Sequence, residues 1–494
     1  MRPSKGVERS IGRVPRTLVE SLLAVALTAF ALLPASASVQ AVAPEDTPAA
    51  DPSATPADPA RPASPPRGVK PRGPTVSRRL ATLRDAGQLT PEAHDAARAR
   101  YSAALAAHRR LTGRRRAELG GVLATLEAVT ARNQLTGPRV ALAFETLERN
   151  REWWTTGALL SYGARVGFAG SELVWQSYPG QGIQVQWLGT FGKANGLTGS
   201  TRYAARLRRL LDEAIALAAP RAGGIAFESW FSFDGGRPPW VSALGQGTGI
   251  QALARAGTKQ GEARYVDAAR DALGIFRQAP PEGVRLVTPL GAHYLQYSFA
   301  PGLRIVNGFV QALNGLHDFS ALTGDPAGTE LFASGAAQLR SELPRADTGA
   351  WSRYSVGGKE SDLGYHRLLR DLLRGLCQRT SDPLYCDTAT RFTEDLTRPP
   401  AVVLLPAAAA ARKGRTARVA FTLDKVSSVA FVAKRAGAVI FTRTERLPRG
   451  RHAFTLPKLR TGGELELRLR AVDPAGNATA VAGVLAVAGS SSRR

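Results

Sequence analysis

The chain has 494 residues and a formal net charge of +25 at pH 7, and it is long enough for two or three domains with a large core. Its two cysteines exclude a disulfide-rich scaffold, and without nearby histidine ligands they do not form a zinc site. The excess charge is mostly arginine spread along the whole chain. This distribution argues against a nucleic-acid-binding protein and suits an anionic polysaccharide, because long-range attraction raises the local concentration of such a ligand.

The first 37 residues have the pattern of a secretion signal. Basic residues between Arg2 and Arg16 precede an apolar run from Leu22 to Leu33, and Ala35-Ser36-Ala37 is a small-residue cleavage motif. The apolar run is shorter than the ~20 residues that span a bilayer. We therefore expect a signal peptide over residues 1–37, export to the cell envelope or the medium, and no stable membrane span after cleavage.

Two segments of contrasting composition follow the signal. Residues 38–75 are rich in Ala and Pro and nearly free of large apolar side chains, so they are expected to form a disordered linker. Residues 76–158 then show helical apolar spacing. Within them Thr90-Pro91-Glu92 is a strong helix start, with a capping Thr and a Pro at the first helical position.

The middle of the chain changes from strands to helical hairpins. Residues 159–196 are expected to be β-rich, because Val174–Gly180 and Ile183–Trp187 alternate and contain many aromatic residues. From residue 197 to 398, helical patterns are interrupted about every 60 residues by short polar breaks. These breaks fall at Thr198-Gly199-Ser200, Gly257-Thr258-Lys259, Thr323-Gly324-Asp325 and Ser381-Asp382-Pro383. Helical hairpins set side by side predict an (α/α) toroid with functional loops on one rim.

Cys377 and Cys386 lie on either side of the last of these breaks. In an exported chain we expect them to form a disulfide that joins the two helices of one hairpin.

The C-terminal region has the period-two pattern of strands. After Pro399-Pro400, an Ala-rich linker over residues 399–415 leads to short alternating runs separated by turn signals. Residues 416–489 are therefore expected to form an immunoglobulin-like or fibronectin-like β-sandwich. We expect this domain to fold separately and to be dispensable for the chemistry of the central region.

Three tyrosine motifs in the central region carry a family resemblance. Tyr297 lies in the loop that ends at Asn307-Gly308-Phe309, Tyr354 follows Asp347-Thr348-Gly349, and Tyr365-His366 begins the next helical pattern. These motifs resemble those of the C-terminal catalytic domain of D-glucuronyl C5-epimerases. The chain is similar to a divergent, bacterial-type member of that family. The resemblance implies an (α/α) toroid, so the expected fold is mainly α, with a β-rich segment before the toroid and a β-sandwich after it.

The resemblance also implies a reaction, removal and return of the C5 proton of a uronate in a glycuronan. Such a reaction needs acid/base groups and enolate stabilisation, and it requires no metal or redox cofactor. We assign catalysis to Tyr354, Tyr365 and Tyr297, since a desolvated Tyr can donate or accept a proton once its pKa is tuned. The expected substrate-binding residues are Gln296, His366, Asn307, Arg304, Gln246, Trp230 and Glu228.

One departure from the family pattern leaves alternatives open. Leu295-Gln296 stands where the family carries two acids, and an amide cannot take up a proton. Glu228 or Asp234 could replace the missing acid, although Glu228 could instead be a structural ion-pair partner. Two other functions remain: a polysaccharide lyase that starts with the same proton abstraction, and a non-catalytic glycan-binding protein of the cell envelope.

Overall fold

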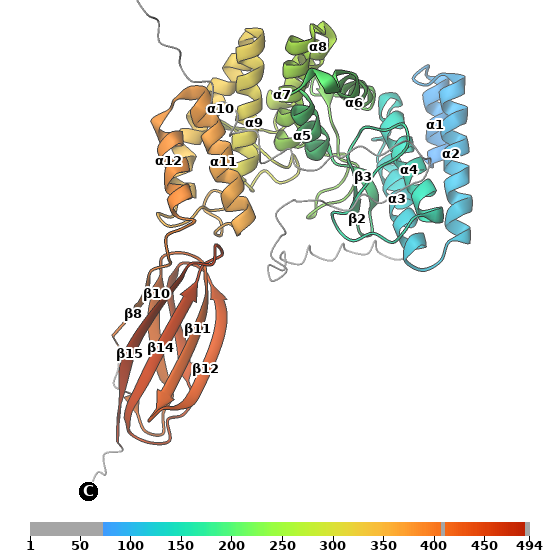
Figure 1. The fold of residues 1–494 in the computed structure, drawn as a ribbon. Helices are drawn as coiled ribbons and strands as arrows, with labels where there is room; N and C mark the ends of the chain where they lie inside the picture. The colour runs from blue at the N-terminus through green and yellow to red at the C-terminus, as the bar shows by residue number, and fades with distance from the viewer. Residues whose placement is uncertain (1–72, 407–410, 490–494) are drawn as a thin grey trace, which may run out of the picture.

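The computed structural model describes residues 73–406 and 411–489. The expected signal peptide and residues 38–72 of the expected linker lie outside the described residues. The described chain begins with four helices that pack on one another at one end of the molecule (Figure 1). They are α1 (Val76–Asp85), α2 (Pro91–Arg110), α3 (Gly113–Ala131) and α4 (Gly137–Thr156). The side chain of Thr90 accepts a hydrogen bond from the backbone N–H of Ala93, as its position before Pro91 predicts.

A small antiparallel sheet follows, made of β1 (Arg165–Val166), β2 (Trp175–Tyr178) and β3 (Gly182–Val185). The sequence interpretation extended this β-rich segment to residue 196, and here it was wrong. Helix α5 (Trp187–Leu197) begins directly after β3. Its start is fixed by the side chain of Gln186, which accepts from the backbone N–H of Gly189, and by the buried ring of Phe191 on its inner face.

Four helical hairpins make up the central region, with their turns at or near the predicted polar breaks. Each pairs an inner with an outer helix: α5 with α6 (Ala204–Ala216), α7 (Ala243–Gln260) with α8 (Ala263–Asp271), α9 (Val306–Thr323) with α10 (Pro326–Ala346), and α11 (Leu363–Thr380) with α12 (Pro383–Glu394). The inner helices α5, α7, α9 and α11 pack in that order (Figure 1). The mainly helical class is thereby confirmed.

Between the hairpins lie two short two-stranded ladders, β4 (Ala219–Arg221) with β5 (Gly224–Ala226) and β6 (Arg285–Thr288) with β7 (Gly291–Tyr294). Cys377 and Cys386 form the expected disulfide across the α11–α12 turn, with their Cα atoms 4.9 Å apart. No helix in the described part of the chain is long and apolar enough to cross a membrane.

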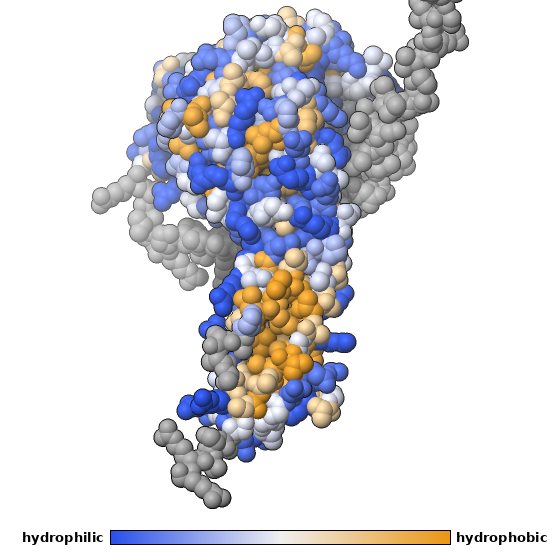
Figure 2. Space-filling view, turned by 90° about the vertical axis from the view of Figure 1, so that its left-hand side faces the viewer, coloured by the Kyte–Doolittle hydropathy of each residue, from blue (hydrophilic) through white to orange (hydrophobic). Residues whose placement is uncertain are grey.

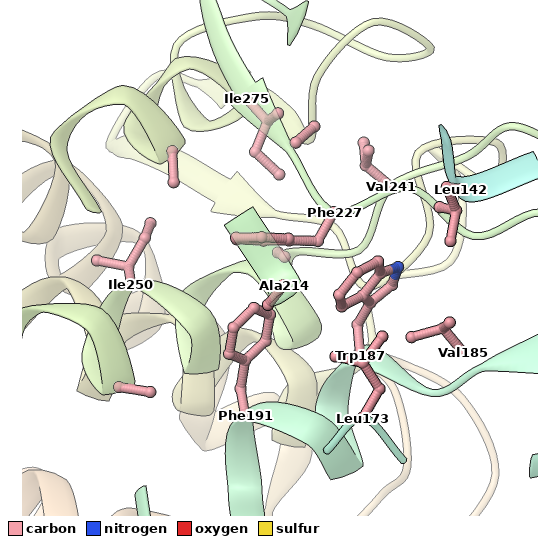
Figure 3. Close-up of a cluster of buried hydrophobic side chains, with 14 of the residues drawn as sticks. Leu142, Leu173, Val185, Trp187, Phe191, Ala214, Phe227, Val241, Ile250 and Ile275 are labelled. Carbon is pink, nitrogen blue, oxygen red and sulfur yellow. The ribbon is translucent and has the colours of Figure 1, made fainter. Parts of the chain in front are cut away.

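One apolar core joins the N-terminal helices, the small sheet and the hairpins. Figure 3 shows where they meet: Trp187 and Phe191 of α5 lie beside Phe227, with Leu142 of α4 and Ile250 of α7 nearby. The Trp187 indole also donates to the backbone carbonyl of Glu228, 2.8 Å away. The connector after β5 is therefore held from inside the core.

The C-terminal region consists of two sheets around a separate apolar core. The sheets have the orders β13-β10-β8 and β12-β11-β14-β15-β9. The strands are β8 (Val402–Leu404), β9 (Ala411–Arg412), β10 (Ala417–Leu423), β11 (Ser427–Arg435), β12 (Ala438–Leu447), β13 (Gly450–Leu456), β14 (Gly463–Val472) and β15 (Ala478–Ala488).

We call this region, residues 399–489, the β domain. Strands β8 and β9 lie in the segment expected to be a linker, so the domain begins earlier than the sequence indicated. Apolar side chains gather on one face of it (Figure 2), and the exposed large hydrophobic side chains of the domain include Val403 of β8 and Val484 of β15.

Candidate active site: a cluster of tyrosines

Five tyrosines from separate segments meet at the surface of the helical region. The rings of Tyr354 and Tyr365 have centroids 4.8 Å apart, and those of Tyr162 and Tyr178 are 5.8 Å apart. Tyr297 joins the two pairs, because it hydrogen-bonds with Tyr354 and its phenol interacts electrostatically with Tyr162. Tyr162 and Tyr365 are exposed, so the cluster is open to solvent. We call these five residues the tyrosine cluster.

Backbone hydrogen bonds hold two of the three predicted tyrosines, Tyr354 and Tyr365. The loop of residues 347–362, called here the tyrosine loop, bonds Tyr354 N–H to the carbonyl of Lys359 at 3.0 Å. The carbonyl of Tyr354 accepts from Val306 N–H at the start of α9. Tyr365 lies in the first turn of α11, where its N–H donates to the capping carboxylate of Asp362 at 2.8 Å. Tyr365 therefore lies in the rigid start of one helix, and Tyr354 is hydrogen-bonded to the start of another.

Burial raises the pKa of each phenol in this group. The pKa of Tyr297 is raised to about 12, mainly by desolvation. Desolvation also raises the pKa of Tyr354, and its hydrogen bonds to Tyr365 and Tyr297 raise it further. For Tyr365 desolvation again dominates, but the hydrogen bond with Tyr354 lowers its pKa. The interaction between the two hydroxyls lowers the pKa of Tyr365 and raises that of Tyr354, so within this pair it favours the phenolate of Tyr365.

Other aromatic rings surround Tyr297. Phe233 and Phe299 lie with ring centroids 5.5 Å and 5.3 Å from it, and Trp240 lies 5.7 Å away. The exposed carboxylate of Asp234 sits in the adjoining turn, with a positive φ of 44°, and its charge raises the pKa of Tyr297. Asp234 is thus an acid close enough to Tyr297 to affect its protonation.

Gln296 lies inside the site, as expected. Its side-chain N–H donates to the Tyr297 hydroxyl at 2.9 Å. Its amide oxygen is buried and has no hydrogen-bond partner among the described residues. A Cβ at Gly308 would collide with this oxygen, which gives a packing reason for the glycine after Asn307. Asn307 itself is buried and accepts from the N–H of Gly308 at 2.8 Å.

Three residues expected to bind substrate are instead part of the interior. Glu228 is buried between Arg139 and Arg221, with N–O distances of 2.6 Å and 2.7 Å. The amide of Gln246 is buried and bonded to the backbone around β5 and the end of α8. Trp230 is 5% exposed and packs in the main core. Glu228 is thus a structural ion-pair partner, and the burial of all three side chains gives no support to their assignment to substrate binding.

Two further expected contacts are also structural. His366 is fully buried and its ring stacks on Trp351, with centroids 3.8 Å apart. Arg304 pairs with the buried carboxylate of Glu342 at 2.8 Å, and that carboxylate also bonds the His293 ring at 2.7 Å. His366 is therefore corrected to a core residue, and Arg304 supports the loop before α9.

Sequence reasoning missed Tyr162 and Tyr178. Tyr178 lies in a run interpreted only as a strand, and Tyr162 lies in no motif that the sequence analysis used. A search for tyrosines on all connectors, rather than in one family's motifs, would have found both.

Fold and site together define a protein built of helical hairpins with a cluster of phenols at its surface. Residues 222–394 match the family described as D-glucuronyl C5-epimerase C-terminus. A D-glucuronyl C5-epimerase of Caenorhabditis elegans is 30% identical over 175 residues, which is 31% of this chain and 28% of that protein. An uncharacterized protein of Methanocaldococcus jannaschii is 26% identical over 160 residues, which is 31% of this chain and 52% of that protein. The predicted resemblance is thus confirmed for the central segment, although the chain spans only part of each relative.

Three solved structures show weak overall likeness. A GH76 alpha-mannanase of Bacteroides thetaiotaomicron gives a TM-score of 0.33 at 12% identity, covering 46% of this chain and 65% of that one. A sugar epimerase from a ruminal bacterium gives 0.29 at 13% identity, covering 42% and 58%. Fibronectin(III)-like modules of Clostridium thermocellum CbhA give 0.14 at 24% identity, covering 18% and 99%. With all TM-scores below 0.5, none of these carries an argument about this chain.

Proposed function

We propose that this chain is an exported enzyme that exchanges the C5 proton of uronate residues in an anionic polysaccharide, as a C5-epimerase does. The observation that carries the proposal is the contact between Tyr354 and Tyr365, which come from two motifs of the matched segment. In this proposal the four hairpins form part of an (α/α) toroid, and the β domain is of the immunoglobulin or fibronectin type. The basic net charge of +25 favours an anionic substrate.

The geometry supports a division of roles within the cluster. Tyr365 takes the C5 proton as a phenolate: it first gives its own proton to solvent, to which its side chain is exposed, and the interaction with Tyr354 partly offsets the desolvation that disfavours this phenolate. The electron pair left at C5 moves into the adjacent carboxylate as an enolate. Tyr297, oriented by Gln296, donates a hydrogen bond to the sugar. Gln296 can bind a hydroxyl or a carboxylate but exchanges no proton.

Inversion at C5 needs a second proton-transferring group on the opposite face of the sugar. A sugar ring in contact on both faces separates those groups by about 7 Å, from two van der Waals contacts of about 3.5 Å each. Tyr354 and Tyr365 share a hydrogen bond, so they act as one unit on one face. Tyr354 and Tyr365 then do not supply both proton-transferring groups, and we assign the opposite face to the exposed Tyr162.

The placement of Tyr354 and Tyr365 on one face of the sugar favours a second candidate function. A base unit on one face is sufficient for a polysaccharide lyase, which removes the C5 proton and then expels the C4 substituent. The non-catalytic alternative, a glycan-binding protein of the cell envelope, rests on Gln296 in the place of an acid.

Incubation with a panel of glycuronans in deuterated water separates the three functions. Deuterium at C5 with a changed epimer ratio supports the epimerase, and an unsaturated product that absorbs in the near ultraviolet supports the lyase. Binding without either product supports the non-catalytic protein. In the epimerase case Tyr162→Phe should keep C5 exchange but lose the change in epimer ratio. Loss of both in this variant would contradict the role assigned to Tyr162.

A further inference from the structure

A buried lysine of the β domain reaches into the helical region. Lys425, in the turn between β10 and β11, is 0% exposed, and its Nζ lies 3.0 Å from the carboxylate of Asp473. The same ammonium donates to the backbone carbonyls of Asp395 and Arg398, just beyond α12. It also lies 5.4 Å from the ring centroid of Trp351 in the tyrosine loop. A buried ammonium whose hydrogen bonds are all satisfied makes the segments that it joins rigid.

A second contact joins the β domain to the other end of the tyrosine loop. The two carboxylate oxygens of Glu360 accept from the backbone N–H groups of Val426 and Arg449, at 2.8 Å and 2.7 Å. Glu360 in turn forms a β-bridge with Arg353, next to Tyr354. The carboxylate is half-buried and bonds two strand ends of the β domain at once. Hydrogen bonds to a charged group are the stronger kind, about twice the neutral ones.

Both contacts lead directly to the two central phenols. Trp351 lies between Lys425 and His366, whose ring stacks on it, and His366 directly follows Tyr365 in α11. At the other end of the loop, Glu360 directly follows Lys359, whose carbonyl accepts a hydrogen bond from the N–H of Tyr354. Through Lys425 and Glu360 the β domain therefore contacts the residues that support Tyr354 and Tyr365.

We propose that the β domain is a brace that positions the tyrosine loop for proton transfer, with Lys425 and Glu360 as its positioning residues. The proposal departs from the sequence expectation that this domain is dispensable, because an independent module would not hold two ends of a functional loop. It deepens the proposed function and rests on it only for the activity measurement below. The arrangement itself stands on the contacts of Lys425 and Glu360.

The test compares Lys425→Met and Glu360→Gln with the wild type in the full chain. Matched controls on the β domain are Lys413→Met, at an exposed lysine, and Glu445→Gln, at an exposed ion pair on β12. Amide hydrogen exchange of residues 347–362 is measured by mass spectrometry. In both test variants this exchange should be roughly tenfold to a hundredfold faster, with α7 unchanged, and the controls should match the wild type. Wild-type exchange of the tyrosine loop in a folded test variant would overturn the proposal.

Activity adds a measurement that a purely structural role would not change. On a glycuronan that the wild type turns over, both variants should lose kcat with little change in KM, at equal folded fraction. A kcat loss that merely follows the loss of folded protein would refute positioning. If Lys425→Met does not fold, Glu360→Gln decides, because Gln keeps the shape and one acceptor of this half-buried side chain. If the wild type exchanges no C5 proton, the proposed function fails, while amide exchange still decides the brace.

Discussion

Because the folded protein keeps the buried His366 ring neutral, it should become less stable below neutral pH. The backbone N–H of Ser352 points to Nδ1 at 3.2 Å, and this donor requires Nδ1 to be an acceptor. The proton of the neutral ring therefore lies on Nε2, which donates to the carbonyl of Phe392 at 3.0 Å. Desolvation, with smaller effects from Arg370 and Lys425, lowers the pKa of His366 from 6.5 to about 4.

The magnitude follows from this difference between the folded and the unfolded chain. Above pH 6.5 the ring is neutral in both states, so its contribution to stability is fully present. As the pH falls toward 4, the unfolded chain binds a proton that the folded chain does not, and stability is lost. At pH 5 the cost is about 2 kcal/mol, since each unit of pKa difference is worth about 1.4 kcal/mol.

The assay is urea unfolding of the wild type and His366→Gln at pH 7.5 and pH 5. Gln can still donate to Phe392 and accept from Ser352, and it does not titrate. Other ionisable groups contribute equally to both proteins, so the difference between them isolates the ring. The stability of the wild type relative to His366→Gln should fall by about 2 kcal/mol between the two pH values. Parallel changes in the two proteins would refute the assignment of His366 as a buried neutral core residue.

Three further predictions concern the disulfide, the amide in the site and the domain joint. Replacing Cys377 and Cys386 together by Ser should lower the free energy of unfolding by about 2–3 kcal/mol. Peptide mapping of the wild type without reduction should recover the two cysteines linked, and two free thiols would contradict the bond. Gln296→Glu should keep C5 exchange or raise it, because a carboxylate can accept from Tyr297 and also transfer a proton; loss of activity in a folded variant would mean that the amide N–H is essential. Desolvation raises the pKa of Asp395 to about 6, so the folded chain holds this proton more tightly and gains stability as the pH falls through 6. The difference in thermal midpoint between Asp395→Asn and the wild type should therefore favour the variant more at pH 8 than at pH 4.5. A difference that favours the variant more at pH 4.5 would contradict the burial of this charge.

The sequence predicted the helical hairpins well because their signals are local. Helix caps such as Asp325 and Asp382, each followed by Pro, mark a helix start within four residues. The start of α5 was missed because Trp187 ends an alternating run, and only the capping side chain of Gln186 and packing on Phe227 decide for a helix. Such packing depends on residues about 40 positions away and leaves no local pattern.

The site was predicted only in part, for a related reason. Motifs identified Tyr297, Tyr354 and Tyr365, which the structure brings together. Burial and partners cannot be seen in a motif, so Glu228 and His366 were placed in the site although ion pairs and stacking hold them in the core. The joint of the β domain was missed as well, because Lys425 is a charged residue in a turn and its burial depends on another domain.

The central claim is that Tyr365 takes the C5 proton, and deuterium exchange at C5 tests it most directly. The rate of exchange is measured on one glycuronan for the wild type, Tyr365→Phe and a control, Tyr203→Phe, whose ring lies beside Arg202 outside the tyrosine cluster. Removing a positioned base should slow exchange about 10²–10⁴-fold, whereas the control should match the wild type. Full exchange in a folded Tyr365→Phe would contradict the account.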